Sequence, residues 1–82
     1  MYFTTLYDQL HGNYVGFISL SKTDIKKQLI PHLQNFDTNF THEEIATILK
    51  EEEGYAGQAD KSWVLVTIIE IQPGQEIDLE LR

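Results

Sequence analysis

Two short segments at the start of the chain have the composition of β-strands. Residues 2–10 and 14–20 are rich in Tyr, Phe, Thr, Val and Ile, which strands favour. The apolar positions of residues 2–10 also fit a helical stripe, so a helix remains an alternative there. Residues 11–13 (His-Gly-Asn) are typical of a turn, because Gly and Asn tolerate a positive φ. The simplest prediction is a β-hairpin.

The middle of the chain predicts two helices. Ser21 can cap the first, and Asp24 then lies in its first turn, where the helix dipole favours an anion. Pro31 interrupts the apolar stripe of this helix and predicts a kink or an end just before it. Residues 41–44 (Thr-His-Glu-Glu) match a capping box that begins the second helix, and Gly54 is expected to stop it. The predicted buried positions are Ile25, Leu29, Leu33 and Phe36 in the first helix and Ile45, Ile48 and Leu49 in the second.

The last third of the chain predicts a loop and a second hairpin. Residues 55–61 are expected to form the loop. Residues 63–71 are apolar on both faces, which is typical of a central strand or of a strand whose second face meets a partner. Pro73 and Gly74 fit a type II turn. Residues 76–82 alternate, with Ile, Leu and Leu inward and charged residues outward, so we expect them to pair with residues 63–71.

These segments predict an α+β fold in the order ββααββ, with a four-stranded antiparallel sheet packed against two helices. We expect one domain over residues 1–82. The chain has no cysteine, which excludes disulfides and favours a reducing compartment. It shows no signal-peptide pattern and no apolar run of about 20 residues. We therefore expect a cytoplasmic protein (in the host cytoplasm if it is phage-encoded) with no membrane association.

Motifs for catalysis, metals and cofactors are missing from the sequence. None of the serines lies in a nucleophile elbow, and no phosphate-binding or dinucleotide-binding glycine motif is present. His42-Glu43 begins a zinc-protease pattern, but Ala46 stands where the second histidine is required. The acidic residues do not form a calcium-binding loop. We expect no enzyme, no metal site and no cofactor.

The charge of the chain is concentrated in its second half. Residues 1–42 hold three acids and three lysines, whereas residues 43–82 hold ten acids against three bases and carry the whole net charge of −7. Such a field repels phosphate backbones and attracts basic protein surfaces. We therefore expect no direct nucleic-acid binding, and a basic surface of another protein as partner.

The acidic residues and one tyrosine are the candidate binding residues. The alternative interpretation is a surface that only keeps the protein in solution. The four tyrosines exceed what a small core can easily bury, and Tyr is enriched at interfaces. The predicted partner-binding residues are Glu51, Glu52, Glu53, Asp60, Asp78 and Glu80, with Tyr55 as an anchor.

In size, acidity and lack of catalytic motifs the chain is similar to small phage-encoded inhibitors of bacterial defence, such as anti-CRISPR proteins and DNA mimics, and to toxin-immunity proteins. The similarity is one of composition and transfers no residue. It implies a protein that blocks a basic surface, such as that of a nuclease or another nucleic-acid-processing enzyme. The alternatives are a structural or assembly subunit that forms a homodimer through its sheet, or a toxin-immunity protein.

Overall fold

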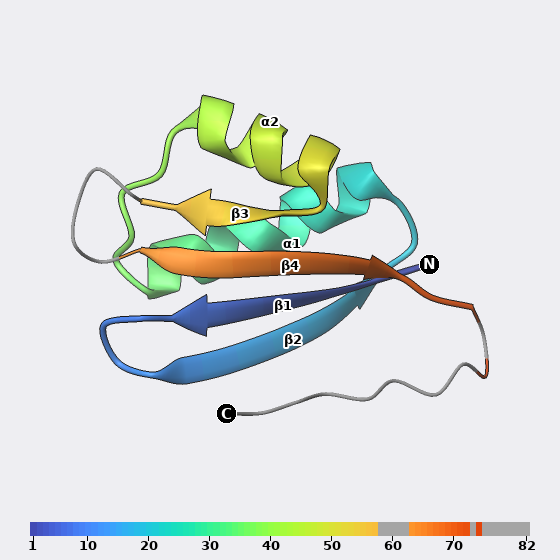
Figure 1. Cartoon of the computed structure of the whole chain (residues 1–82), viewed down its shortest axis with the longest axis horizontal. Helices are drawn as coiled ribbons and strands as arrows, with labels where there is room; N and C mark the ends of the chain where they lie inside the picture. Colours follow the sequence, from blue (N-terminus) through green and yellow to red (C-terminus); the bar gives the residue numbers. More distant parts are fainter. Residues whose placement is uncertain (58–62, 73, 75–82) are drawn as a thin grey trace.

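A computed structural model describes residues 1–57, 63–72 and 74, and it shows one sheet with both helices packed on the same face (Figure 1). The elements are β1 (Tyr2–Asp8), β2 (Asn13–Ser19), α1 (Lys22–Asn35), α2 (His42–Glu51), β3 (Glu53–Ala56) and β4 (Val64–Glu70). Every pairing in the sheet is antiparallel, and the strand order is β2-β1-β4-β3. The expected α+β class, with four antiparallel strands, two helices and the order ββααββ, is confirmed.

The predicted first hairpin is present, so residues 2–8 form a strand and not the alternative helix. Gly12 adopts a positive φ of 70° in the connection. The carboxylate of Asp8, which is buried at the end of β1, accepts the N–H of Leu10 at 3.1 Å and lies 2.7 Å from Nδ1 of His11. Asp8 therefore holds the turn that follows β1 in place.

Both helices begin where the sequence predicts. The Asp24 N–H donates to Ser21 Oγ at 3.2 Å. At the second start, the Glu44 N–H donates to Thr41 Oγ1 at 3.1 Å and the Thr41 N–H donates to Glu44 Oε1 at 2.8 Å, which completes the capping box. The other carboxylate oxygen of Glu44 accepts the Gly57 N–H at 3.0 Å. Glu44 thus ties the start of α2 to the residue that follows β3.

Of the two outcomes expected at Pro31, the helix end is wrong, because α1 continues through Pro31 to Asn35. A proline in a helix removes one N–H donor and disturbs one turn. Leu29 and Leu33 are fully buried on either side of Pro31 and anchor both parts of the helix in the core. Tertiary packing therefore outweighs the local cost of the proline.

The expected stop of α2 at Gly54 and the expected loop from residue 55 are also wrong. The helix ends at Glu51, Glu52 takes a left-handed conformation, and Glu53–Ala56 form β3. A Cβ on Gly54 would lie 2.9 Å from Ile48 Cγ1. The glycine is therefore needed for the close approach of β3 to α2, and it does not serve as a helix stop.

The central position of residues 64–70 is confirmed, because β4 lies between β1 and β3. On one side β4 pairs with β1, and on the other side its residues 64–67 pair with β3. The second predicted hairpin stays a prediction. Residues 76–82 themselves lie outside the described residues.

The core lies between the sheet and the helices. Strand residues with alternating positions point into it, as the strand periodicity requires. Buried in this layer are Leu6, Ile25, Leu29, Leu33, Ile45, Ile48, Ala56, Val64, Val66 and Ile68. The opposite side of the sheet is not covered by any described helix or strand (Figure 1).

Candidate protein-interaction surface

The side of the sheet away from the helices is called here the open face. It carries the strand residues that alternate with the buried ones. Its members are Phe3, Thr5 and Tyr7 of β1, Tyr14, Gly16 and Ile18 of β2, Glu53 and Tyr55 of β3, and Leu65, Thr67 and Ile69 of β4. Aromatic and aliphatic side chains predominate in this set, and it contains no Lys or Arg.

An aromatic row crosses the open face from one edge of the sheet to the other. The register aligns Tyr14 with Tyr7, Tyr7 with Leu65, and Leu65 with Tyr55. The rings of Tyr7 and Tyr14 are 5.4 Å apart, and Trp63 meets Tyr55 edge-on at 5.0 Å. Tyr14 is 45% exposed and Tyr55 is 43% exposed. The two ends of the row therefore present aromatic surface to solvent.

A second apolar row lies across the other end of the open face. Phe3 is aligned with Ile18 on one side and with Ile69 on the other. Ile18 is 54% exposed and Ile69 is 43% exposed. Single exposed apolar residues are common on protein surfaces, whereas two aligned rows on one uncovered face are typical of an interaction site.

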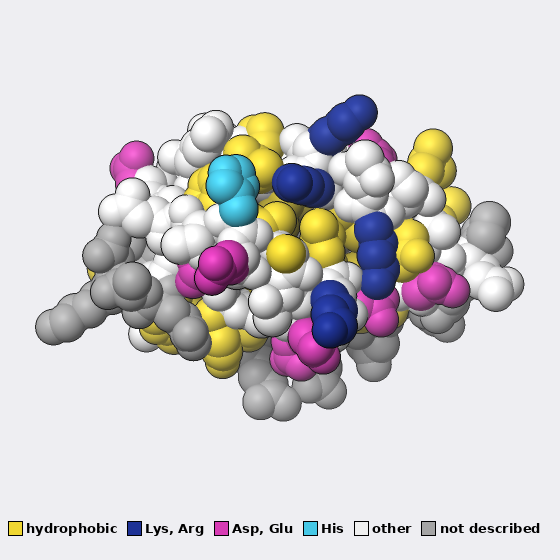
Figure 2. All heavy atoms as spheres, turned by 90° about the horizontal axis from the view of Figure 1, so that it is seen from above, with side chains coloured by type: hydrophobic (Ala, Val, Ile, Leu, Met, Phe, Trp, Pro, Cys, Tyr) yellow, Lys and Arg dark blue, Asp and Glu magenta, His cyan; other side chains and the backbone are white. Residues whose placement is uncertain are grey.

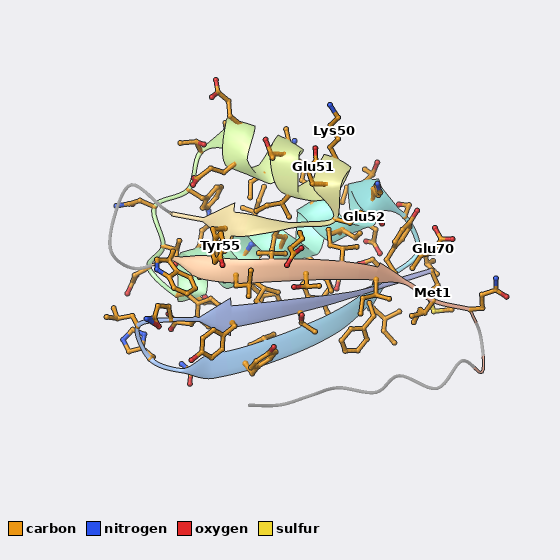
Figure 3. All side chains as sticks on the ribbon, in the orientation of Figure 1. Met1, Lys50, Glu51, Glu52, Tyr55 and Glu70 are labelled. Carbon is orange, nitrogen blue, oxygen red and sulfur yellow. The ribbon has the colours of Figure 1, made fainter. Side chains whose placement is uncertain are left out.

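Four glutamates lie where α2 ends, β3 begins and β4 ends, and this group is called the acidic end: Glu51, Glu52, Glu53 and Glu70. A main-chain hydrogen bond joins the segment between α2 and β3 to β4: the Glu52 carbonyl accepts the Ile68 N–H at 2.8 Å. Glu51, Glu52 and Glu70 lie toward the end of the molecule that holds Met1 (Figure 3). Glu53 also belongs to the open face, so the acidic end and the open face are continuous.

Glu52 occupies a position that does not suit its residue type. Its φ of 63° is in the left-handed region, where residues other than Gly are strained. The three consecutive glutamates also lie at the C-terminus of α2, where the helix dipole favours cations. Local stability is therefore not the reason for acids at this point of the chain.

Glu52→Gly is expected to raise the free energy of unfolding by about 1 kcal/mol, because an L-residue in the left-handed region costs about 1–2 kcal/mol and the flexibility of Gly in the unfolded chain offsets part of the gain. The matched control Glu51→Gly removes the same charge from a helical position, and it should lower the stability by about 0.5–1 kcal/mol. Urea unfolding of the two variants measures both values. A loss of stability in both variants would contradict the assigned conformation of Glu52.

The structure brings four of the predicted binding residues together and adds others. Glu51, Glu52, Glu53 and Tyr55 follow one another around the end of α2 and along β3. Asp60, Asp78 and Glu80 lie outside the described residues. Glu70, Tyr7 and Tyr14 were not predicted as binding residues, although the alternation of β1 and β2 signals an outward position for the two tyrosines.

A shallow hollow of about 340 Å³ lies between α2 and β3. Tyr55 is one of its lining residues and also stands at the end of the aromatic row. The hollow is lined by Thr41, Glu43, Glu44, Thr47, Ile48, Gly54 and Tyr55.

Within the described part of the chain, no three His, Asp or Glu side chains form a group that could hold a metal ion. No helix in the same part is long and apolar enough to cross a membrane. The Asp8–His11 pair combines a buried carboxylate with an exposed imidazole, and its hydrogen bonds close the turn after β1.

A scan against protein-family models found no match, and searches of curated proteins and of solved structures found no similar protein.

Proposed function

We propose that this is an interaction protein that docks its open face and acidic end on a basic surface of another protein and thereby blocks that surface. A nucleic-acid-processing enzyme is the partner class that fits best, because such enzymes present long basic channels. The block is steric and electrostatic: the sheet covers the channel while the carboxylates pair with Arg and Lys.

The observation that carries this proposal is that exposed aromatic rings and the Glu53 carboxylate lie on one side of the sheet, next to the acidic end, and that the described strand residues on this side include no base. Tyr55 and Glu53 lie on the same strand and the same face, two residues apart. An arginine side chain can stack on a tyrosine ring while its guanidinium pairs with a carboxylate. Buried aromatic residues and Arg are the usual anchors of protein interfaces.

The charge distribution also favours the open face as the side that meets a basic partner. Lys22, Lys26 and Lys27 belong to α1, on the side of the sheet opposite the open face. Figure 2 looks onto the α2 side, where Lys side chains lie among Asp and Glu side chains. The net charge of −7 steers basic partners toward the protein, and the three lysines of α1 lie on the side of the sheet away from the open face.

The test uses an oligo-arginine peptide without aromatic residues and the fluorescence of Trp63, the only tryptophan of the chain, which contacts Tyr55. We expect saturable binding that weakens as salt is raised. The double variant Glu51→Gln/Glu53→Gln should bind several-fold more weakly, because each exposed ion pair contributes about 0.2–1 kcal/mol.

The matched control is Asp37→Asn/Glu43→Gln, which removes the same charge from exposed positions outside the acidic end. It should bind nearly as the unmodified protein does. Equal losses in the two double variants would show that only the net charge matters, and an affinity that does not change with salt would overturn the electrostatic mechanism.

A second candidate function is a homodimer in which two copies pack their open faces together, and the two apolar rows favour it. Sedimentation at micromolar concentration separates the candidates. A stable dimer that dissociates in Ile18→Asp, on the open face, would support the dimer. A monomer would leave the open face free for a different protein.

A further inference from the structure

β2 is an edge strand that lacks the features by which edges are usually protected. It spans Asn13–Ser19, contains no charged residue and no proline, and pairs only with β1 among the described elements (Figure 1). Unprotected edges pair readily with another strand, and natural proteins prevent this with Lys, Pro or a bulge in the edge strand. β2 is therefore suited to receive a further strand.

The hydrogen bonds of the sheet identify the groups that point outward from β2. The Gln9 N–H donates to the Trp63 carbonyl and the Ile71 N–H donates to the Met1 carbonyl, so odd-numbered residues of β1 bond to β4. Even-numbered residues of β1 consequently bond to the odd-numbered residues of β2. The main-chain groups that face away from β1 are therefore those of Tyr14, Gly16 and Ile18.

One of these outward groups already has a partner. The Gln28 side chain of α1 donates to the Ile18 carbonyl at 3.3 Å, in agreement with the outward direction of this group. A carbonyl oxygen has two lone pairs and can accept a second hydrogen bond. Within the described part of the chain, the main-chain groups of Tyr14 and Gly16 have no partner on this side of β2.

We propose that β2 pairs with β2 of a second copy of this chain, antiparallel and about a two-fold axis that passes between the two Gly16 residues. In this register Gly16 faces Gly16 of the second copy, and Tyr14 faces Ile18 of the second copy. Each of these pairs exchanges two main-chain hydrogen bonds. Any other register leaves an outward residue of each β2 strand without an outward residue opposite it.

The pairing also covers two strongly exposed leucines. Among the described large apolar side chains, the most exposed are Leu20, directly after β2, at 79% and Leu10, in the turn before β2, at 62%. In the antiparallel pair, Leu20 of each copy lies opposite Gly12 of the other copy, beside the turn that holds Leu10. This contact occurs twice, once at each end of the joined strands. A second copy therefore accounts for both leucines, whereas an unrelated strand would have no reason to.

The charge distribution allows two copies to meet at β2. The strand is uncharged, and residues 1–42 carry no net charge. The acidic end lies across the sheet, because β1 and β4 separate β2 from β3. In the joined sheet the two β3 strands are about 33 Å apart, at about 4.8 Å per strand, which is well beyond the screening length of about 8 Å in physiological salt. The acidic ends therefore do not prevent the pairing.

The dimer joins the two four-stranded sheets into one continuous sheet. Because the two-fold axis is perpendicular to the sheet, both open faces point to the same side. The aromatic row of each copy, which ends at Tyr14, continues into the second apolar row of the other copy, which begins at Ile18. The pairing does not depend on the proposed basic partner. With such a partner, the dimer presents two binding surfaces side by side and gains affinity for targets that carry two basic segments.

The test places charges at the position that pairs with itself. Gly16→Lys and Gly16→Glu each put like charges opposite each other in the dimer, whereas a mixture of the two variants puts Lys opposite Glu. Sedimentation equilibrium gives the dissociation constant of the dimer for each variant alone and for the equimolar mixture. Thr5→Lys is the matched control, because Thr5 is aligned with Gly16 on the same face but belongs to β1.

A single strand edge is a small interface, so we expect the unmodified protein to dimerise with a dissociation constant of about 10–100 µM. Gly16→Lys and Gly16→Glu should each weaken the dimer by about fivefold or more, and mixing them should restore it. Thr5→Lys should dimerise as the unmodified protein does. A second readout needs no substitution: the amides of Tyr14 and Gly16 should exchange more slowly as the concentration is raised, with Val66 unchanged as the core reference.

Four results would overturn the proposal. The first is an unmodified protein that stays monomeric at about 1 mM, and the second is a dimer that both Gly16 variants leave unchanged. The third is a mixture that dimerises no better than the separate variants while the exchange at Tyr14 and Gly16 does not depend on concentration. The fourth is a dimer that is lost only in Thr5→Lys, which would assign the contact to the open face.

Discussion

Ile68→Ala is expected to lower the free energy of unfolding by about 2–4 kcal/mol, whereas Ile69→Ala, one residue further along β4, should lower it by about 1 kcal/mol or less. Ile68 points into the layer between sheet and helices and is 5% exposed, whereas Ile69 lies on the open face. The same three carbons are removed in both variants. The difference therefore measures how unequally the two faces of the sheet are packed.

Urea unfolding of both variants gives the two losses in the free energy of unfolding, provided that the dependence of this free energy on urea concentration (the m-value) is the same in both. Losses of equal size would contradict the description of the open face, because they would show that Ile69 is also packed against something. A small loss in Ile68→Ala would contradict the position of the core.

Gly54→Ala is expected to lower the stability by about 1–3 kcal/mol, since added atoms in a packed layer force side chains and backbone to shift. The new Cβ would lie 2.9 Å from Ile48 Cγ1, in the contact between β3 and α2. Gly16→Ala is the matched control in another strand. Its Cβ would meet the tip of the Phe3 ring at 3.0 Å, on the open face.

The Phe3 ring can swing away, and a strand position favours Ala over Gly by about 0.5–1 kcal/mol. Gly16→Ala should therefore be neutral or slightly stabilising in thermal unfolding, while Gly54→Ala lowers the midpoint. If Gly54→Ala were as well tolerated as Gly16→Ala, β3 would not lie as close to α2 as the structure shows.

Local chemistry made much of this fold predictable. The capping residues Ser21 and Thr41 set the helix starts, and the composition around Gly12 indicated the first hairpin. The apolar residues on both faces of residues 63–71 indicated a central strand. Each of these signals acts within a few residues, so the sequence shows it directly.

Among the predictions that were wrong are the loop from residue 55 and the end of the first helix at Pro31. Both depend on contacts between segments that are distant in the sequence. β3 has only four residues, one of them Gly54, and its strand conformation depends on pairing with β4 and packing on α2. The helix passes Pro31 because buried leucines on both sides hold it. Neither effect can be seen in a local pattern.

The candidate site was predictable in its chemistry and not in its arrangement. The excess of acids and the number of tyrosines are properties of composition. That Tyr14, Tyr7 and Tyr55 lie in one row follows from the strand order β2-β1-β4-β3, which sequence reasoning did not provide. Glu70 joins Glu52 for the same reason, through the pairing of β3 with β4.

The central claim is that the β3 side of the open face, with the acidic end, is where a basic partner binds. The most direct measurement is a map of backbone chemical shifts during titration with oligo-arginine. The account predicts that the largest changes fall on residues 51–55 and around Glu70, with little change along α1. Changes spread evenly over all exposed acids, or largest at Asp37 and Glu43, would contradict it.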